Sequence, residues 1–275
     1  MRKNKRESSD VISIIILSLF LVCTLLPLFI MVFTSFKDQN EILMDFWGLP
    51  ERLNLDNYIT AWKDIGGYAY NSFKTTLLAV AGIVVVSVFA GYAFSKLPIK
   101  GKKPLFLVVM GFRMVPTGLL IIPMFMNVLS IGLDNNHWGV ILTNIATGST
   151  MAVMLTKSFF DQLPDSLFEA AKIDGAGELK TLTNILIPLS KPIIGTVIVF
   201  NFFTYFNQFM WPYIVLSDKA LKTIPIGLAA LAGENGVDFG LQSAGYSIVA
   251  IPLIILFLAT SKIYVNGITS GAVKG

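Results

Sequence analysis

Cysteine and histidine are almost absent from this sequence of 275 residues, each occurring once. The single cysteine, Cys23, excludes an intrachain disulfide and argues against a cysteine-based metal site. The single histidine, His137, stands beside Trp138 without carboxylate or thiol neighbours. One imidazole alone is a poor metal site, so we expect an interfacial aromatic pair there and no bound metal in this chain.

Charge is also scarce, since only 14% of the residues are charged, 54% are hydrophobic and the mean hydropathy is +0.70. This composition excludes an ordinary soluble domain. A net charge of +4 could suggest a nucleic-acid partner. The basic residues lie between apolar runs, however, where membrane topology explains them better. We therefore predict a multi-pass protein of the cell membrane, in contact with lipid and not with nucleic acid.

Several catalytic motifs are missing. No G-x-x-x-x-G-K-[ST] loop occurs, so the chain has no recognisable cradle for ATP phosphates. A nucleophile elbow, an H-E-x-x-H helix and a carboxylate pair within a span are lacking too, which argues against a membrane hydrolase and a proton-coupled carrier. We predict a transport subunit that is not an enzyme, and its energy would have to arrive through a partner.

Apolar runs of bilayer length predict an all-α membrane protein with six transmembrane helices, because about 20 helical residues cross the hydrocarbon core. The first run is longer than a signal-peptide core and lacks a small-x-small cleavage site, so we expect it to be retained. Residues 37–73 are polar and aromatic, and we expect them to fold against the membrane surface. The predicted membrane domain is 11–264, between a terminus at 1–10 and a tail at 265–275, with spans at 11–33, 75–94, 105–129, 138–159, 193–216 and 244–264.

The distribution of lysine and arginine predicts the orientation of these spans. With the N-terminus in the cytoplasm, that side holds 14 of them and the opposite side 6. Both termini and the polar loop at 162–192 are therefore expected in the cytoplasm.

The third predicted span contains the prolines Pro116 and Pro123, so we expect its helix to be kinked or interrupted. Arg113 is the only ionisable residue well inside any predicted span. A charge within the membrane is a functional-site hypothesis by default. The alternative is an arginine near the helix end whose head reaches the lipid headgroups.

The fifth predicted span is the most polar. Four polar residues recur there at helical spacing, with two further polar or aromatic residues to one side. Such a stripe should face protein or a water-filled path, because amides are costly in lipid. It could line a path for a neutral polyhydroxylated substrate or join subunits. The candidates are Asn201, Thr204, Tyr205, Gln208, Asn207 and Trp211, to which we add Arg113.

The loop at 162–192 carries the strongest local signals. Pro164 and Asp165 suit the first turn of a helix, and Gly175 should end it. Leu167, Ala170, Ala171 and Asp174 share one shallow face, which Glu169 and Lys172 flank. The face would suit close approach by another protein. Alternatively, it belongs to an ordinary amphipathic helix lying on the bilayer.

The loop also resembles a family motif, the EAA loop of importer permeases in ATP-binding-cassette transporters. Only Ile187 departs, where the family usually has leucine. The matching residues, with the spacing of the motif, are Glu169, Ala170, Ala171, Gly175, Ile185 and Pro188. The resemblance implies the type I importer permease fold and a coupling helix that docks on an ATPase through Glu169, Ala170, Ala171, Lys172, Asp174 and Gly175.

Further segments are similar to carbohydrate-uptake permeases, and most of all to the smaller permease subunit of the maltose-type importer. These segments are Asn71 to Phe73, Phe206 to Asp218, Thr223 to Leu231 and the terminal GAVKG. The resemblance implies two ATPase subunits that bind ATP and magnesium, a second, different permease and an extracytoplasmic sugar-binding protein. It also implies that Asp218 to Gln242 touches the binding protein, that Thr269 to Gly275 reaches the ATPases, and that the sugar site lies mainly in the other permease.

The predicted function is import of a sugar, an oligosaccharide by this resemblance, by alternating access. One alternative is a permease for a different neutral solute, since only Arg113 is charged along the path. Another is a secondary carrier that works without an ATPase.

Overall fold

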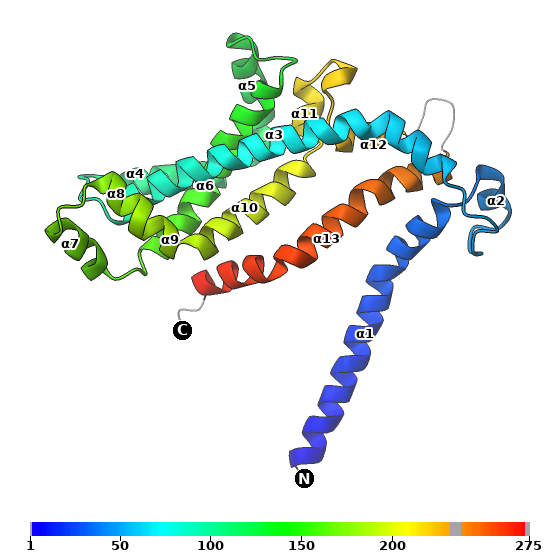
Figure 1. Ribbon diagram of the computed structural model, residues 1–275, viewed down its shortest axis with the longest axis horizontal. Coiled ribbons are helices and arrows are strands. Elements are labelled where there is room, and N and C mark those ends of the chain that lie inside the picture. The colour runs from blue at the N-terminus through cyan, green and yellow to red at the C-terminus, as the bar shows by residue number, and fades with distance from the viewer. Residues whose placement is uncertain (1, 232–237, 273–275) are drawn as a thin grey trace. The chain divides into compact units, whose positions relative to one another are not determined.

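The computed structural model describes residues 2–231 and 238–272, and within them every regular element is helical (Figure 1). This confirms the predicted all-α class. The chain forms two compact units, one of Met1–Gly66 with Gly227–Ile254 and the other of Gly67–Ile226 with Ile255–Gly275. Three helices contribute residues to both units: α3 (Asp56–Ser95), α12 (Ile224–Ala230) and α13 (Phe239–Ala272).

The first unit contains α1 (Arg2–Thr34), α2 (Gln39–Met44), the start of α3 (Asp56–Ser95), most of α12 (Ile224–Ala230) and the first part of α13 (Phe239–Ala272). Asn57 ties the end of α1 to α3, because its amide donates to the carbonyls of Ser35 (3.0 Å) and Lys37 (2.8 Å). The buried Lys37 ammonium in turn donates to the carbonyl of Asp45 at 2.6 Å. These contacts fix the connection that follows the first span.

The second unit holds the remaining helices. Figure 1 shows α6 and α10 running alongside α3. Its elements after α3 are α4 (Lys102–Gly111), η1 (Phe112–Met114), α5 (Thr117–Ser130), α6 (His137–Phe160), α7 (Asp165–Ile173), α8 (Glu178–Thr181), the π-helical turn η2 (Leu182–Leu186), α9 (Ile187–Leu189), α10 (Lys191–Phe206), α11 (Met210–Val215) and η3 (Lys219–Leu221).

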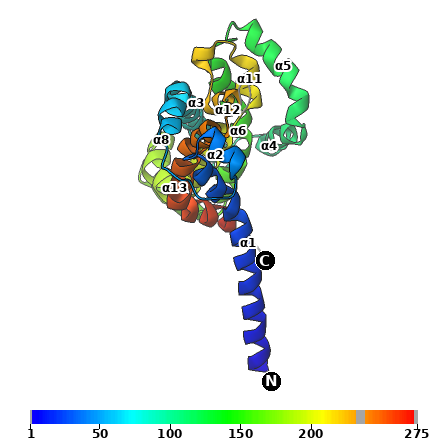
Figure 2. The same ribbon diagram turned by 90° about the vertical axis from the view of Figure 1, so that its right-hand side faces the viewer.

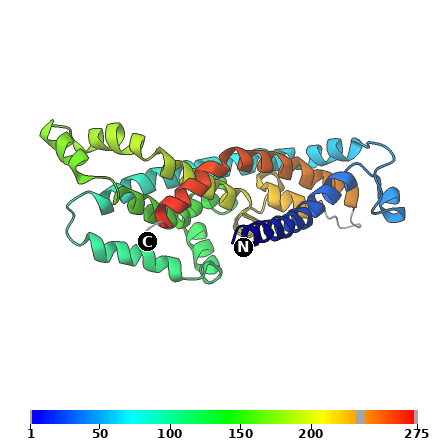
Figure 3. The ribbon, with the colours of Figure 1, turned by 90° about the horizontal axis from the view of Figure 1, so that it is seen from below.

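In the described part of the chain, four helices are long and apolar enough to cross a membrane, and six spans result if each of two bent helix pairs counts as one. One bent pair confirms the predicted interruption of the third span: α4 with η1 meets α5 at 102° (Figures 2 and 3). The break lies at Pro116, which precedes α5 and forces Val115 into an extended conformation (φ −77°, ψ 121°). Pro123, by contrast, lies inside α5.

Helix boundaries differ from the predicted spans at several places. Helix α3 already begins at Asp56, so much of the segment predicted at the membrane surface is helical, with Ala61, Ile65 and Tyr68 buried along it. Helix α13 runs from Phe239 through Ala272, beyond the predicted span at both ends, while residues 273–275 of the tail lie outside the described residues. An apolar run in the sequence marks only the part of a helix that is long enough to cross the bilayer. The helix itself can continue beyond that run, as α3 and α13 do here.

The continuous helix predicted over 193–216 is wrong in its second half. Helix α10 ends at Phe206, and α11 begins only at Met210. Pro212 explains the break, since a proline has no N–H and its ring collides with the carbonyl four residues earlier, here that of Gln208.

A polar clamp joins α3 to η3 and to the residues that follow it. The amide of Asn71 donates to the carbonyls of Ala220 (2.8 Å) and Lys222 (2.9 Å), and the hydroxyl of Ser72 accepts from the N–H of Ile224 at 2.8 Å. Both side chains are buried. These contacts give a structural reason for the Asn-Ser pair at this point of the sequence.

Replacement of the clamp residue, Asn71→Ala, is expected to lower the melting temperature of the detergent-purified protein. Two carbonyls would lose their partner, and a buried polar group left unpaired costs about 1–3 kcal/mol. The control is Asn184→Ala, because Asn184 is an exposed residue of η2. Equal melting of the two variants would contradict the clamp.

Candidate functional site

Helix α7 is the short loop helix predicted from the sequence. Asp165 occupies its first position, after Pro164, and its last turn closes through two bonds, from Gly175 N–H to the Lys172 carbonyl (3.1 Å) and from Ala176 N–H to the Ala171 carbonyl (2.9 Å). This arrangement needs a left-handed residue after the helix, and Gly175 has a φ of +73°. The prediction that Gly175 ends the helix is confirmed.

Lys96, the residue directly after α3, holds the start of α7 with a side chain that is largely covered. Lys96 Nζ lies 2.6 Å from Asp165 Oδ1 and donates to the Leu163 carbonyl at 2.7 Å. The same ammonium lies 4.9 Å from the centre of the Phe168 ring. Only 7% of the Lys96 side chain is exposed, against 79% for that of Asp165.

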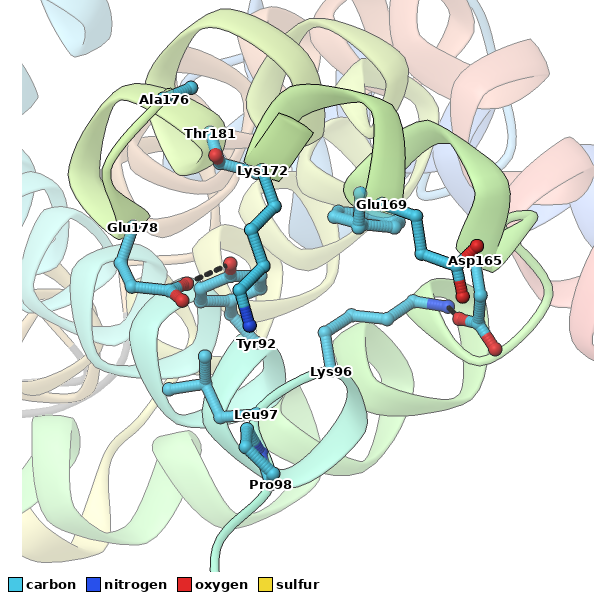
Figure 4. A pocket seen from close by; sticks show the side chains of 11 residues that line it. Tyr92, Lys96, Leu97, Pro98, Asp165, Glu169, Lys172, Ala176, Glu178 and Thr181 are labelled. Carbon is cyan, nitrogen blue, oxygen red and sulfur yellow. Dashed lines mark hydrogen bonds and ion pairs between the residues drawn. The ribbon is translucent and has the colours of Figure 1, made fainter. Parts of the chain in front are cut away.

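A second contact from α3 holds α8. The hydroxyl of the buried Tyr92 donates to Glu178 Oε2, and the Tyr92 ring lies 6.4 Å from that of Phe168. Between the two contacts lies a pocket of about 280 Å³ that is also lined by Glu169, Lys172 and Thr181. In Figure 4 the Lys172 side chain extends over this pocket toward Tyr92, and Glu169 extends toward Asp165.

An apolar cluster lies beside these polar contacts and packs against the loop. It joins Val88 of α3 and Phe160 of α6 to Leu182 and Leu186 of η2 and to Ile193 of α10, all buried. Phe168 of α7 packs against this cluster. The loop is therefore packed on three helices.

The carboxylate of Asp161 links the ends of α3 and α6. It accepts from Lys157 Nζ at 2.6 Å and from the Ser95 hydroxyl at 2.7 Å. Partial burial pushes the pKa of Asp161 up, but the hydrogen bonds from Lys157 and Ser95 prevail and hold that pKa below its usual range. The carboxylate therefore stays ionised at neutral pH.

Five of the six predicted docking residues are exposed: Glu169, Ala170, Lys172, Asp174 and Gly175. Ala171 is buried, at 5% exposed, so it lies on the inner side of α7 and its placement on an accessible face is corrected. The reason is the helical period. Phe168 faces the cluster beneath, and Ala171, three residues later, faces the same way.

Two apolar side chains of the loop were missed by the sequence analysis. Ile173 is 86% exposed at the end of α7, and Leu179 is 65% exposed in α8, while Leu167 of the predicted face is 41% exposed. Together with Leu167, they give α7 and α8 three large exposed apolar side chains. Their isolation between polar neighbours was the available signal.

The residues predicted for a substrate path do not form one stripe. Asn201 and Tyr205 converge on α6, since a Cβ placed on Gly148 would lie 2.5 Å from Tyr205 Oη and 3.0 Å from Asn201 Oδ1. Asn201 is buried and donates to the Val197 carbonyl at 2.8 Å, and the Tyr205 hydroxyl lies 3.2 Å from that of Thr147. These two residues act as contacts between α10 and α6.

The other path candidates lie elsewhere. Thr204 and Asn207 are exposed and bond back to carbonyls of α10, at 2.8 Å and 2.9 Å. Gln208 follows the end of that helix, so its predicted place on the stripe is wrong, and Trp211 is buried in α11. Gln208 Oε1 and Trp211 Nε1 are both buried without a hydrogen-bond partner among the described residues.

Arg113 is exposed in η1, the turn at the bend between α4 and α5. It does not lie in the middle of a continuous helix, because the break at Pro116 follows it by one turn. Among the described residues, no three His, Cys, Asp or Glu side chains gather closely enough to hold a metal ion.

Comparison with known proteins places this architecture. Residues 83–266 match the family described as "Binding-protein-dependent transport system inner membrane component". The chain is 34% identical over 262 residues to the probable ABC transporter permease protein YurM of Bacillus subtilis, covering 95% of this chain and 87% of that protein. It is 32% identical over 265 residues to the trehalose/maltose transport system permease protein MalG of Thermococcus litoralis, covering 94% of each.

A solved structure shares the fold. It is a chain of a bacterial ABC transporter involved in the import of the acidic polysaccharide alginate, with a TM-score of 0.80, 22% identity and coverage of 93% of this chain and 95% of that one. The predicted importer permease fold is thereby confirmed, as is the resemblance on which it was based. The chain belongs to the family of binding-protein-dependent transport system inner membrane components, and it is a multi-pass permease component of the cytoplasmic membrane without an ATPase site of its own.

Proposed function

We propose that this chain is one permease subunit of an importer that moves an oligosaccharide across the cytoplasmic membrane by alternating access. The observation that carries the proposal is helix α7, a short helix whose Phe168 packs on the cluster shared by α3, α6 and α10 and which leaves Glu169, Ala170 and the apolar Ile173 exposed. Such a surface suits a partner that pushes on the loop. Relatives support the sugar, among them the diacetylchitobiose uptake permease NgcG of Streptomyces coelicolor, at 28% identity.

The energy comes from two ATPase subunits, which bind ATP and magnesium and dock on the outer face of α7. The docking residues are Glu169, Ala170, Lys172, Asp174 and Gly175, with Leu167 and Ile173 as apolar contacts. A second, different permease completes the path, and an extracytoplasmic binding protein delivers the sugar. Helix α1 also has to be covered by lipid or by other subunits, because none of its most apolar stretch is buried by its own chain.

In the proposed orientation, both termini and α7 lie in the cytoplasm. The excess of lysine and arginine on that side supports it. The segment Asp218 to Gln242 then lies outside and meets the binding protein, although residues 232–237 of it are outside the described part. The tail from Thr269 approaches the ATPases on the cytoplasmic side.

Charge reversal at the docking face, Glu169→Lys, is expected to reduce at least about tenfold the ATPase that co-purifies with the tagged chain in mild detergent. Like-charge contacts across an interface cost several kcal/mol, and each 1.4 kcal/mol is about tenfold in affinity. Uptake of radiolabelled maltose, raffinose or diacetylchitobiose, whichever the native cells import through this chain, should fall in parallel.

The control is Glu51→Lys, the same charge change at an exposed residue before α3. Recovery of the tagged chain without an ATPase, both as the native sequence and as the Lys172→Cys variant after crosslinking, would contradict the proposal. Uptake into vesicles that hold no ATP would instead indicate a secondary carrier.

A further inference from the structure

We propose that Lys96 is a positioning residue that joins the ATPase-docking helix α7 to α3, so that a displacement of α7 moves α3 with it. This inference rests on the proposed function of the α7 loop. Chain connectivity makes the joint necessary. The loop continues directly from α6 and into α10, whereas Lys96 and Asp165 are separated by 69 residues. A movement of α7 therefore reaches α3 through non-covalent contacts, and those of Lys96 are the polar ones at the start of α7.

The three contacts of Lys96 define both the place and the direction of α7. Asp165 is the first residue of the helix, Leu163 precedes its cap, and Phe168 lies one turn further on. An ammonium with three donors bonds the first two at 2.6 and 2.7 Å and faces the ring of the third. Because the contacts spread over the first turn, α7 cannot tilt without either moving Lys96 or breaking them.

The end of α3 is itself held firmly enough to serve as a lever. Lys102 Nζ donates to the carbonyl of Ser95, the last residue of α3 (3.0 Å), and to that of Leu97, two residues later (2.8 Å). The Lys96 N–H still bonds to the Tyr92 carbonyl at 2.8 Å. The backbone around Lys96 is therefore fixed, and its side chain is left to face α7.

A second contact between α3 and the loop lies one helical turn before Lys96. Tyr92 lies in the last turn of α3, and Lys96 directly follows the helix and continues its hydrogen bonding through its N–H to the Tyr92 carbonyl, so the two side chains lie on the same side of the helix end. Tyr92 bonds Glu178 at the start of α8. The end of α3 thus contacts both short helices of the loop, α7 and α8, and the pocket of Figure 4 lies between the two contacts. An ion pair whose carboxylate is 79% exposed adds little to stability, so its position suits guidance of α7 better than support of the fold.

The experiment measures whether α7 and the end of α3 move as one body. Spin labels are placed on Ser166→Cys, which lies in α7 outside the proposed docking residues, and on Ile99→Cys, both exposed, in a Cys23→Ser background of the intact complex. Pulsed electron paramagnetic resonance gives the distance distribution between the labels without nucleotide and after trapping with ATP, magnesium and vanadate. With Lys96 present, we expect one narrow distribution that is the same in both states. A shift of its maximum on trapping would overturn the inference.

Lys96→Met keeps the apolar stem but removes the charge and the donors. We expect it to at least double the width of the distribution, and Lys96→Arg to restore the native width. Lys100→Met, in the same connection and exposed, is the control and should not change it. A native width in Lys96→Met would overturn the inference. If Lys96→Met does not accumulate, Asp165→Asn replaces it, with the same criterion.

Failure of the proposed function is recognised separately. If no ATPase co-purifies with the native chain, that function fails, and the nucleotide-free comparison of Lys96→Met with the native residue still decides whether Lys96 fixes α7.

Discussion

Gly175→Val is expected to reduce both ATPase co-purification and uptake about tenfold. Gly175 follows α7 with a φ of +73°, a conformation that costs an L residue roughly 1–2 kcal/mol, and a β-branched one the most. That energy corresponds to a factor of about 5–30 in the population of the native turn. No heavy atom lies within 4 Å of the position a Cβ would take, so the whole effect comes from the backbone.

Loss of this turn would act on the docking face directly. The N–H groups of Gly175 and Ala176 close α7 by bonding the carbonyls of Lys172 and Ala171. When the turn opens, the open side chain of Ile173 and the carboxylate of Asp174 lose their fixed positions. Docking should therefore weaken although the membrane helices remain folded.

Gly177→Val is the matched control. Gly177 also has open space around its Cβ position, but its φ is −73°, which any residue adopts. It should retain near-native uptake and the melting temperature of the native protein. Equal losses in the two valine variants would show that bulk on this loop, and not the left-handed turn, causes the effect.

The features that could be predicted from sequence are the local ones. Apolar runs, the breaker Pro116 and the turn residue Gly175 each act within a few residues, and the structure has the helices, the bend and the left-handed turn there. The break before α11 was also encoded locally, by Pro212. It was overlooked because polar residues at helical spacing suggested an unbroken helix across it.

The features that could not be predicted depend on contacts between distant residues. Lys96 and Tyr92 look like an ordinary helix end, and nothing nearby in the sequence indicates that they meet Asp165 and Glu178. The burial of Ala171 likewise depends on which side of α7 rests on the apolar cluster. Periodicity shows which residues share a face of a helix, but not what that face meets.

Gly139→Ala is expected to destabilise the second unit more than any other glycine-to-alanine change near a helix start. A Cβ at Gly139 would lie 2.4 Å from the Leu133 carbonyl oxygen and 3.0 and 3.1 Å from methyl groups of Val128 and Val215. The first contact is with backbone, which cannot move aside as the end of a side chain can. Overpacking of this kind costs about 1–3 kcal/mol.

The turn between α5 and α6, which would have to move, also holds the segment that follows α11. Asn135 lies in it, with its N–H bonded to the Val215 carbonyl at 2.8 Å and its side chain accepting from the N–H groups of Ser217 and Asp218. Those residues begin the segment proposed to meet the binding protein. Gly139→Ala should therefore lower the melting temperature and also weaken stimulation of ATP hydrolysis by the binding protein.

Gly118→Ala, inside α5 with open space, should be neutral or slightly stabilising, since alanine is the better helix former by roughly 1 kcal/mol. Native melting of Gly139→Ala would mean that the turn between α5 and α6 yields, and that the 217–218 segment is positioned by the Asn71 clamp instead.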